Sequence, residues 1–172
     1  MSDEPQNYSA IPLRLVLDTN VWLDWLVFDD PGVAAIKSAA AAGRAEILIG
    51  PACIQELERA LTYSLQKKLL DTDAQAACLA ECRRVARMAD VISSRGDQAQ
   101  VAHNLPICRD PNDQKFLELA RDCGADYLVT RDRALLDLAR RKVHPAPFRI
   151  VTPQQFTDAL DARSASAATA ER

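Results

Sequence analysis

The sequence has few of the residues that bind soft metals or form disulfide bonds. It contains two histidines, and its five cysteines are an odd number without a C-x-x-C pair. Cys78 and Cys82 are spaced to share one face of a helix, but two ligands do not complete a zinc site. We therefore interpret the cysteines as reduced, buried thiols, in keeping with the usual burial of this residue type.

The chain also lacks a long apolar run and an excess of positive charge. No stretch approaches the roughly 20 apolar residues that cross a membrane, and the start, MSDEPQNYSA, has neither the basic nor the apolar region of a signal peptide. We expect a cytoplasmic protein with no membrane contact. Because phosphate binding uses lysine and arginine, the net charge of −3 argues against extensive wrapping of nucleic acid. Any nucleic-acid contact must be local.

The length and composition predict one domain. The chain has 172 residues, of which 48% are hydrophobic, which is enough for one well-buried core and short for two. Residues 1–11 are polar, and residues 164–172 are small and weakly apolar. We interpret these two segments as loose tails around a single domain over residues 12–163.

Short apolar runs alternate with longer helical stretches along this domain. That order is typical of an α/β fold, and it predicts a three-layer α/β/α sandwich with a mostly parallel central sheet. The predicted strands are 13–17, 46–50, 126–130 and 148–151, and the predicted helices are 21–28, 33–42, one opened by Pro51, 73–89, 111–123, 133–141 and one opened by Pro153. Between residues 90 and 109 we expect a loop with fragments of strand, with VIS and LPIC as the candidates.

Four acidic residues stand where the predicted elements change. Asp18 ends the first strand, Asp132 follows the strand at 126–130, Asp113 lies at the start of the helix at 111–123, and Glu56 lies on the helix opened by Pro51. The carboxyl ends of parallel strands form the crevice in which α/β proteins bind ligands. The fold therefore predicts that these four carboxylates lie near one edge of the sheet.

Each acid also has a structural interpretation that requires no chemistry. Asp18, Thr19 or Asn20 could cap the helix that follows the first strand, and Asp132 could cap the helix at 133, because short polar side chains accept hydrogen bonds from free N–H groups. The sequence Asp110-Pro111-Asn112-Asp113 has the form of a helix start, with a cap and a proline at the first helical position.

The four acids together favour a metal site. Carboxylates crowded at one sheet edge repel one another unless protons or cations neutralise them. Oxygen ligands without histidine are typical of Mg²⁺ or Mn²⁺ sites, and Mg²⁺ takes one or two carboxylates and keeps several waters.

These motifs resemble those of the PIN-domain family of metal-dependent nucleases. The matching segments are LVLDTN around Asp18, the helix residue Glu56, DPNDQKFLELA around Asp113 and ADYLVTRDRALL around Asp132, and the resemblance covers residues 13–160. DPND followed by KFLELA and GADYLVTRD is also similar to the branch of toxin components of toxin–antitoxin modules. The resemblance implies a PIN-like fold and an Mg²⁺- or Mn²⁺-dependent endoribonuclease that hydrolyses RNA phosphodiester bonds.

The resemblance further implies a role for each matched position. Asp18, Asp113 and Asp132 would be metal ligands directly or through water, and Glu56 would be a fourth ligand or an outer acceptor. The residues that would orient these ligands are Thr19, Asn20 and Thr130, with Asp110 as a possible fifth acid that its capping position already explains. Glu58 lies about 200° from Glu56 around the helix, so only one of them points inward.

The resemblance also implies partners, and it leaves one rival interpretation open. A toxin would have a small antitoxin that inserts a basic segment into the acidic groove, and the family resemblance suggests a homodimer. The alternative is a catalytically inactive PIN-like module that binds RNA or protein.

Basic and aromatic side chains near the acids have two interpretations each. Arg131 stands where the family commonly has a small residue, and it could reach a phosphate or pair with a neighbouring acid. The residues that could steer RNA are Arg131, Arg133, Arg140, Arg141 and Lys142, although a solvated helix face explains such a cluster equally simply. Trp22 and Trp25 could stack on bases, but their apolar neighbours favour packing.

Overall fold

The protein is described from a computed structural model over residues 11–63, 69–89, 105–141 and 145–170. Five parallel strands form one sheet in the order β3-β2-β1-β4-β5. The strands are β1 (Leu13–Leu17), β2 (Ala45–Ile49), β3 (Ala86–Met88), β4 (Tyr127–Val129) and β5 (Arg149–Val151). This arrangement confirms the predicted α/β class with a parallel central sheet.

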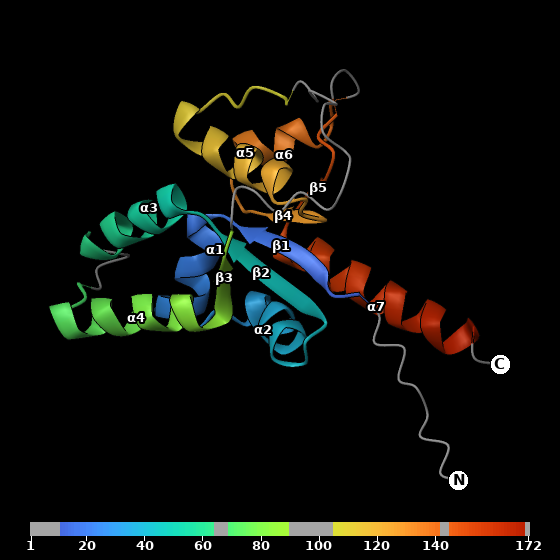
Figure 1. The fold of residues 1–172 in the computed structure, drawn as a ribbon, viewed down its shortest axis with the longest axis horizontal. Coiled ribbons are helices and arrows are strands. Elements are labelled where there is room, and N and C mark those ends of the chain that lie inside the picture. Colours follow the sequence, from blue (N-terminus) through green and yellow to red (C-terminus); the bar gives the residue numbers. More distant parts are fainter. Residues whose placement is uncertain (1–10, 64–68, 90–104, 142–144, 171–172) are drawn as a thin grey trace, which may run out of the picture.

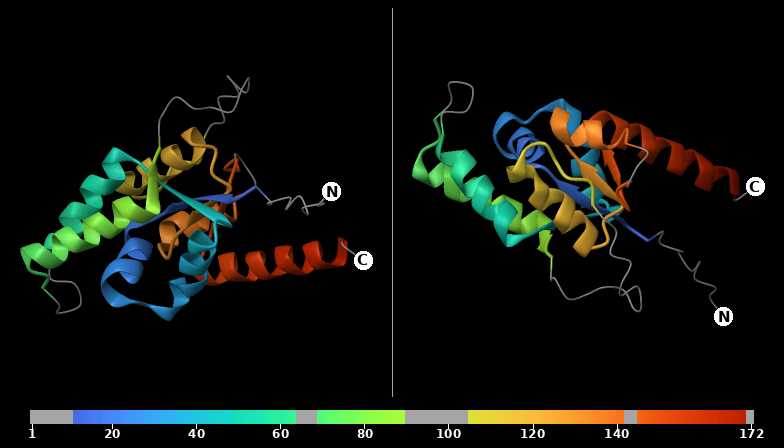
Figure 2. Two further views of the ribbon diagram at one scale, coloured as in Figure 1. Left: turned by 60° about the horizontal axis from the view of Figure 1, so that its bottom comes forward. Right: turned by 90° about the horizontal axis from the view of Figure 1, so that it is seen from above.

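Helices connect the strands and cover both faces of the sheet. They are α1 (Thr19–Leu23), the π-helical turn η1 (Asp24–Phe28), the 3-10 turn η2 (Pro31–Val33), α2 (Ala34–Ala41), α3 (Pro51–Thr62), α4 (Thr72–Val85), the 3-10 turn η3 (Pro111–Asp113), α5 (Gln114–Asp122), α6 (Arg133–Leu138) and α7 (Pro153–Ala170). Helix α2 contacts α7 on one face, whereas α5 packs against β1 and β4 on the other (Figures 1 and 2). The sheet is therefore the middle of three layers.

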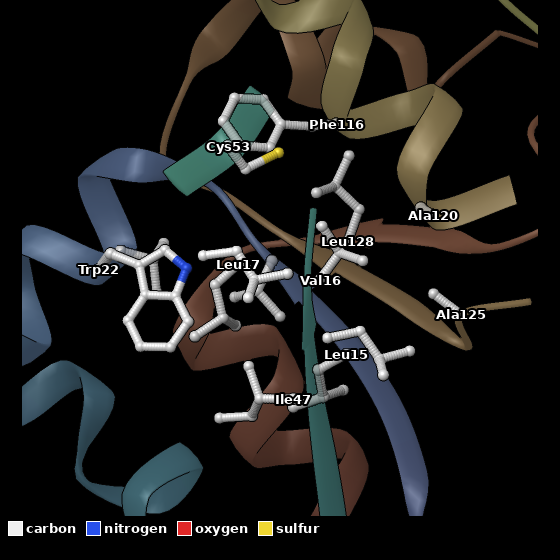
Figure 3. Close-up of a cluster of buried hydrophobic side chains, with 14 of the residues drawn as sticks. Leu15, Val16, Leu17, Trp22, Ile47, Cys53, Phe116, Ala120, Ala125 and Leu128 are labelled. Atoms are coloured by element: carbon white, nitrogen blue, oxygen red, sulfur yellow. The ribbon is translucent and has the colours of Figure 1, made fainter. Parts of the chain in front are cut away.

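The central strand β1 supplies the middle of the hydrophobic core. Leu15, Val16 and Leu17 are all almost fully buried, because a parallel strand covered by helices on both faces has no solvated side. Figure 3 shows these side chains between Trp22 on one side and Phe116 on the other. None of the five cysteines forms a disulfide bond, as predicted, and four of them are buried as expected, whereas Cys78 is partly exposed. Trp22 and Trp25 are also buried, with ring centroids 5.7 Å apart, which confirms that they pack in the core.

Two glycines end helices where the chain needs a left-handed backbone. Gly43 follows α2 with φ 68°, and Gly124 follows α5 with φ 59°. Glycine adopts this conformation without the steric penalty of a Cβ atom, which is why it commonly follows the last helical residue. Both helix ends had been predicted at these glycines.

The segment after α4 was predicted incorrectly. The expected helix over 73–89 ends at Val85, and residues 86–88 form β3, with Ala86 opposite Ile47 and Met88 opposite Ile49. Backbone pairing with β2 determines this short strand, whereas its own side chains give no strand pattern. Of the two expected strand fragments, LPIC at 105–108 has no regular structure, and VIS lies outside the described residues.

The C-terminal segment was also predicted incorrectly. Helix α7 continues to Ala170, so residues 164–170 are helical and not a loose tail. Alanine has the highest helix propensity, and Ser164 Oγ donates to the Leu160 carbonyl at 3.0 Å within the helix. Residues 161–166 are exposed, and Figure 2 shows this part of α7 extending past the sheet. The helices of the described ranges include none with the length and apolar character of a membrane span.

Candidate active site

Two of the four predicted acids lie at the point where the strand order of the sheet reverses. From β1 the chain builds β2 and β3 on one side and later β4 and β5 on the other, so β1 and β4 are neighbours. Asp18 follows β1 directly, and Asp132 lies three residues after β4. Ligands of open α/β sheets bind in the crevice outside the carboxyl ends of the strands at such a reversal. Both acids therefore lie at the expected binding position.

Thr130 connects these two acids. Its hydroxyl donates to Asp18 Oδ2 at 2.5 Å and accepts a hydrogen bond from the Asp132 backbone N–H at 2.9 Å. Thr130 has no solvent exposure, and Asp18 is only 4% exposed. A hydroxyl can donate one hydrogen bond and accept others, so the buried Thr130 side chain bonds to the Asp18 carboxylate and to the Asp132 N–H at the same time. The structure thus places Thr130, which was predicted to orient the acids, in contact with two of them.

Asp18 and Asp132 also cap the helices that follow them. Asp18 Oδ1 accepts a hydrogen bond from the Asn20 N–H at 2.8 Å, and Asp132 Oδ1 accepts from the N–H groups of Ala134 and Leu135 at 2.7 and 3.2 Å. The remaining oxygen of Asp132, Oδ2, has no donor among the described residues. Asn20 takes part through its backbone N–H, and it is exposed.

Glu56 comes to the same region from α3. Its Oε1 accepts a hydrogen bond from Thr19 Oγ1 at 2.7 Å, and its Oε2 forms an ion pair with Lys115 Nζ of α5. Glu58 faces away from this group and pairs with Arg83 of α4 at 3.1 Å. The structure therefore places Glu56, and not Glu58, toward the other acids.

Asp113 differs from the other three because no described residue donates a hydrogen bond to its carboxylate. The pKa of Asp113 is raised to about 6, first by burial and then by the negative charges of Asp132, Asp18, Asp110 and Glu56, in that order of effect. Burial is likewise the largest cause of the raised pKa of Asp18, followed among the raising effects by Asp132 and Glu56. These mutual effects place all four predicted acids in one electrostatic cluster.

Asp110 lies at the edge of this cluster. It caps η3 through its Oδ1, which accepts a hydrogen bond from the Asn112 N–H at 2.9 Å, and its side chain is exposed. The capping interpretation is therefore sufficient for this residue, although its charge also contributes to the raised pKa of Asp113.

The donor chemistry of the cluster fits a hard divalent cation that keeps most of its water. The four side chains offer carboxylate oxygens without histidine or thiolate ligands, which is the set that Mg²⁺ and Mn²⁺ prefer. Within the described ranges, no group of three or more acidic, histidine or cysteine side chains encloses a metal-sized position. Mg²⁺ needs only one or two direct carboxylates and reaches the others through water, so the geometry suits a hydrated ion better than an enclosed one.

Lys115 is the site residue that the sequence did not indicate. Its side chain reaches from α5 to Glu56 and also donates to the Asn112 carbonyl. A lysine in the first turn of a helix faces the positive end of the helix dipole, which is unfavourable. That unfavourable placement, two residues after Asp113, is the only signal in the sequence that this lysine has a nearby negative partner.

Arg131 does not contact any of the four acids. Its guanidinium pairs with Asp24 of η1 at 2.6 Å and with Asp30 at 3.2 Å. Gly32 lies against this group, since a Cβ atom there would be 2.7 Å from Arg131 Nη2. The sequence left open whether Arg131 reaches a phosphate or pairs with a neighbouring acid, and in this structure it pairs with acids. These ion pairs hold the segment before α2 beside the start of α6.

The other basic residues that were predicted to steer RNA lie at different places, and of those described only Arg133 directly follows one of the four acids. Arg133 is exposed at the start of α6, whereas Arg140 and Arg141 are exposed beyond its other end, about 9 Å along a helix of six residues. Arg141 lines a groove of about 630 Å³ between α6, β5 and α7 that none of the four acids lines. Lys142 lies outside the described residues.

The fold and the site define a parallel α/β protein with a cluster of carboxylates at the strand-order reversal, suited to a hard divalent cation. Residues 14–134 match the family model of the PIN domain, which is more than half of the chain, so this chain belongs to the PIN-domain family. PIN domains are generally nucleases, and they typically use divalent metal ions. No curated protein matches the chain.

Proposed function

We propose that this protein is an Mg²⁺- or Mn²⁺-dependent endoribonuclease that hydrolyses RNA phosphodiester bonds. The observation that carries this proposal is the convergence of Asp18, Glu56, Asp113 and Asp132 at the reversal of the sheet, with Asp113 lacking any donor in the described part of the chain. A half-buried carboxylate among like charges is stable only with a proton or a cation beside it. Membership of the PIN-domain family supports a nuclease.

The side chains would divide the work between holding a cation and orienting its ligands. Asp18, Asp113 and Asp132 would hold the ion directly or through water, while Thr130 fixes Asp18 and the loop to Asp132. The ion, when bound, would lower the pKa of a bound water for in-line attack and neutralise charge on the leaving oxygen. The carboxylates would position the ion and act neither as nucleophiles nor as leaving groups.

An RNA cleavage assay with the purified full-length protein tests this function. We expect cleavage of a mixture of single-stranded and hairpin RNAs with Mg²⁺ or Mn²⁺, its loss with EDTA, and its recovery with excess metal. Asp18→Asn and Asp132→Asn should abolish cleavage, because an amide cannot replace an anionic ligand, although both asparagines can still cap their helices. Asp161→Asn, an exposed change on α7, is the matched control and should leave cleavage unchanged.

The rival function is a catalytically inactive module that binds RNA or protein. In that case the protein would bind RNA in the same experiments and cleave none of it with either metal, and Asp18→Asn would leave binding intact. Cleavage that persists in EDTA, or in Asp18→Asn, would instead point to a contaminating nuclease.

We further propose that the protein is the toxin of a toxin–antitoxin module and that it forms a homodimer. The motifs around Asp113 and Asp132 support the first part, and the acidic cluster is complementary to a basic segment of a small antitoxin. Expression of the unaltered gene should arrest bacterial growth, and expression of Asp132→Asn should not. If cells that express the unaltered gene grow as fast as cells that express Asp132→Asn, the toxin role is contradicted. Sedimentation analysis of the purified protein tests whether it is a dimer.

A further inference from the structure

The ion pair between Lys115 and Glu56 distinguishes Glu56 from the three aspartates. Both oxygens of Glu56 have a protein donor, Thr19 on Oε1 and the Lys115 ammonium on Oε2. Both oxygens of Asp18 also have donors, but these are the neutral Asn20 N–H and Thr130 hydroxyl. Asp113 has no donor among the described residues, and Asp132 has one free oxygen. The carboxylates are therefore not equivalent, because Glu56 is the one of the four whose negative charge is paired with a protein cation among the described residues.

The Lys115 ammonium is held on several sides. Besides Glu56, it donates to the Asn112 carbonyl and lies 5.1 Å from the centroid of the Phe116 ring. The side chains of Lys115 and Glu56 are 22% and 30% exposed, so the pair is partly shielded from solvent. A shielded ammonium beside Oε2 repels a divalent ion at that oxygen, since charges interact more strongly away from bulk water.

The pair also links three parts of the site. Lys115 lies two residues after Asp113 on α5, Glu56 lies on α3, and Thr19 follows Asp18 at the start of α1. The chain of contacts from Lys115 through Glu56 to Thr19 therefore ties the segments that carry Asp113 and Asp18 to each other across α3.

We infer that Lys115 is a positioning residue that keeps Glu56 out of direct coordination, so that Asp18, Asp113 and Asp132 alone hold the metal. This inference rests on the proposed function. It assigns the Lys115 ammonium, and not the metal ion, as the charged partner of Glu56. The metal then faces three acids, and the Lys115–Glu56 pair contributes no net charge.

Measuring Mn²⁺ affinity by calorimetry, in a set of charge-balanced variants, tests the inference. Lys115→Met releases Glu56 as an extra anionic ligand, so Mn²⁺ should bind about tenfold more tightly, a change of about 1.4 kcal/mol. Glu56→Gln/Lys115→Met removes one negative and one positive charge together and should bind within about threefold of the unaltered protein, since charges that cancel leave the metal's surroundings nearly unchanged. Asp113→Asn should bind at least about tenfold more weakly, as expected for loss of a ligand.

Two further variants separate this role from general structure. Lys115→Arg keeps the cation and should retain the affinity of the unaltered protein. Glu58→Gln/Arg83→Met removes a comparable pair between α3 and α4 and should change neither affinity nor stability by a measurable amount. Melting in EDTA gives a metal-free readout, in which Lys115→Met should melt below the unaltered protein and Glu56→Gln/Lys115→Met should regain most of the difference.

The outcomes distinguish this inference from the proposed function. If the unaltered protein binds Mn²⁺ and the double variant binds it about tenfold more weakly, Glu56 is a direct ligand. If Lys115→Met binds Mn²⁺ no more tightly than the unaltered protein, Lys115 does not keep Glu56 from the metal. Either result would overturn the inference alone. Absence of Mn²⁺ binding by the unaltered protein would overturn the proposed function, and the inference with it.

Discussion

Replacing Asp113 by asparagine should stabilise the metal-free protein at neutral pH. The pKa of Asp113 is about 6 in the folded protein against its ordinary value of 3.8. If the whole shift acted on folding, a rise of that size would lower the free energy of unfolding at neutral pH by about 3 kcal/mol. Because the side chain is only half-buried, screening by solvent reduces this to about 1 kcal/mol. Asparagine has no charge to accommodate, so it should relieve this amount.

The sign of the effect fixes its dependence on pH. Well below pH 3.8 the Asp113 carboxyl is protonated in both the folded and the unfolded chain, and it has no effect on stability. As the pH rises from about 4 to 6, the unfolded chain loses its proton first, so the free energy of unfolding falls. Above about pH 6 the full penalty is present. The advantage of Asp113→Asn should therefore be small at pH 4 and nearly complete at pH 7.

Bound metal should reverse this order. Mn²⁺ at 100 times its dissociation constant stabilises the unaltered protein by about 2.7 kcal/mol. If Asp113→Asn binds about a hundredfold more weakly, the same Mn²⁺ concentration adds only about 0.4 kcal/mol to it. The variant, more stable by about 1 kcal/mol in EDTA, should then be less stable by about 1 kcal/mol in Mn²⁺.

Urea unfolding followed by circular dichroism is the assay, at pH 4, 5, 6 and 7 with EDTA and at pH 7 with excess Mn²⁺. Asp161→Asn, an exposed aspartate on α7, is the control and should follow the unaltered protein throughout. Equal stability of Asp113→Asn and the unaltered protein at pH 4 and pH 7 in EDTA would refute the crowding of the acids on which the site is built.

Three other changes have outcomes that follow from the contacts. Thr130→Val removes a buried hydroxyl that donates to Asp18, so urea unfolding should show a loss of about 1–3 kcal/mol, and Thr130→Ser should restore most of it. Arg131→Ala leaves the partly buried carboxylate of Asp24 without its partner, which should lower the melting temperature by a few degrees, equivalent to about 1 kcal/mol; an unchanged melting temperature would show that the pair contributes nothing. Deleting residues 164–172 starts after Leu160, the last α7 residue that is buried among those whose exposure is described, so the free energy of unfolding should change by less than about 0.5 kcal/mol, and a larger loss would indicate that this helix end packs on the domain.

The sequence was sufficient for the features that local chemistry determines. The apolar run of residues 13–17, interrupted only by Arg14, is typical of a central strand covered on both faces, and the acids that follow such runs must lie at one edge if the strands are parallel. Gly43 and Gly124 marked the helix ends because their backbone conformation excludes most other residues. For these reasons the fold class and the grouping of the four acids were predictable.

The remaining features depend on contacts between distant segments. Residues 86–88 form a strand because they pair with the backbone of β2. The side chains of Ala86, Arg87 and Met88 do not by themselves predict a strand. Lys115 acquires its role from Glu56, which lies 59 positions earlier in the chain. Arg131 likewise finds Asp24 and Asp30 across about a hundred residues. A long basic side chain has many possible acidic partners in the sequence, and only the tertiary structure determines which of them it contacts.

Capping and metal binding, which are alternatives when each acid is considered alone, are compatible in this structure. Asp18 and Asp132 each use one oxygen for the N–H groups of the helix that follows, and the second oxygen of Asp18 also accepts from the Thr130 hydroxyl. Helix N-termini also stabilise carboxylates, which offsets part of the repulsion within the cluster. Asp113 has no such support among the described residues, and its pKa is correspondingly raised. The caps therefore orient two of the acids, whereas Asp113 has no hydrogen-bond donor among the described residues, and a cation would be stabilised most beside Asp113.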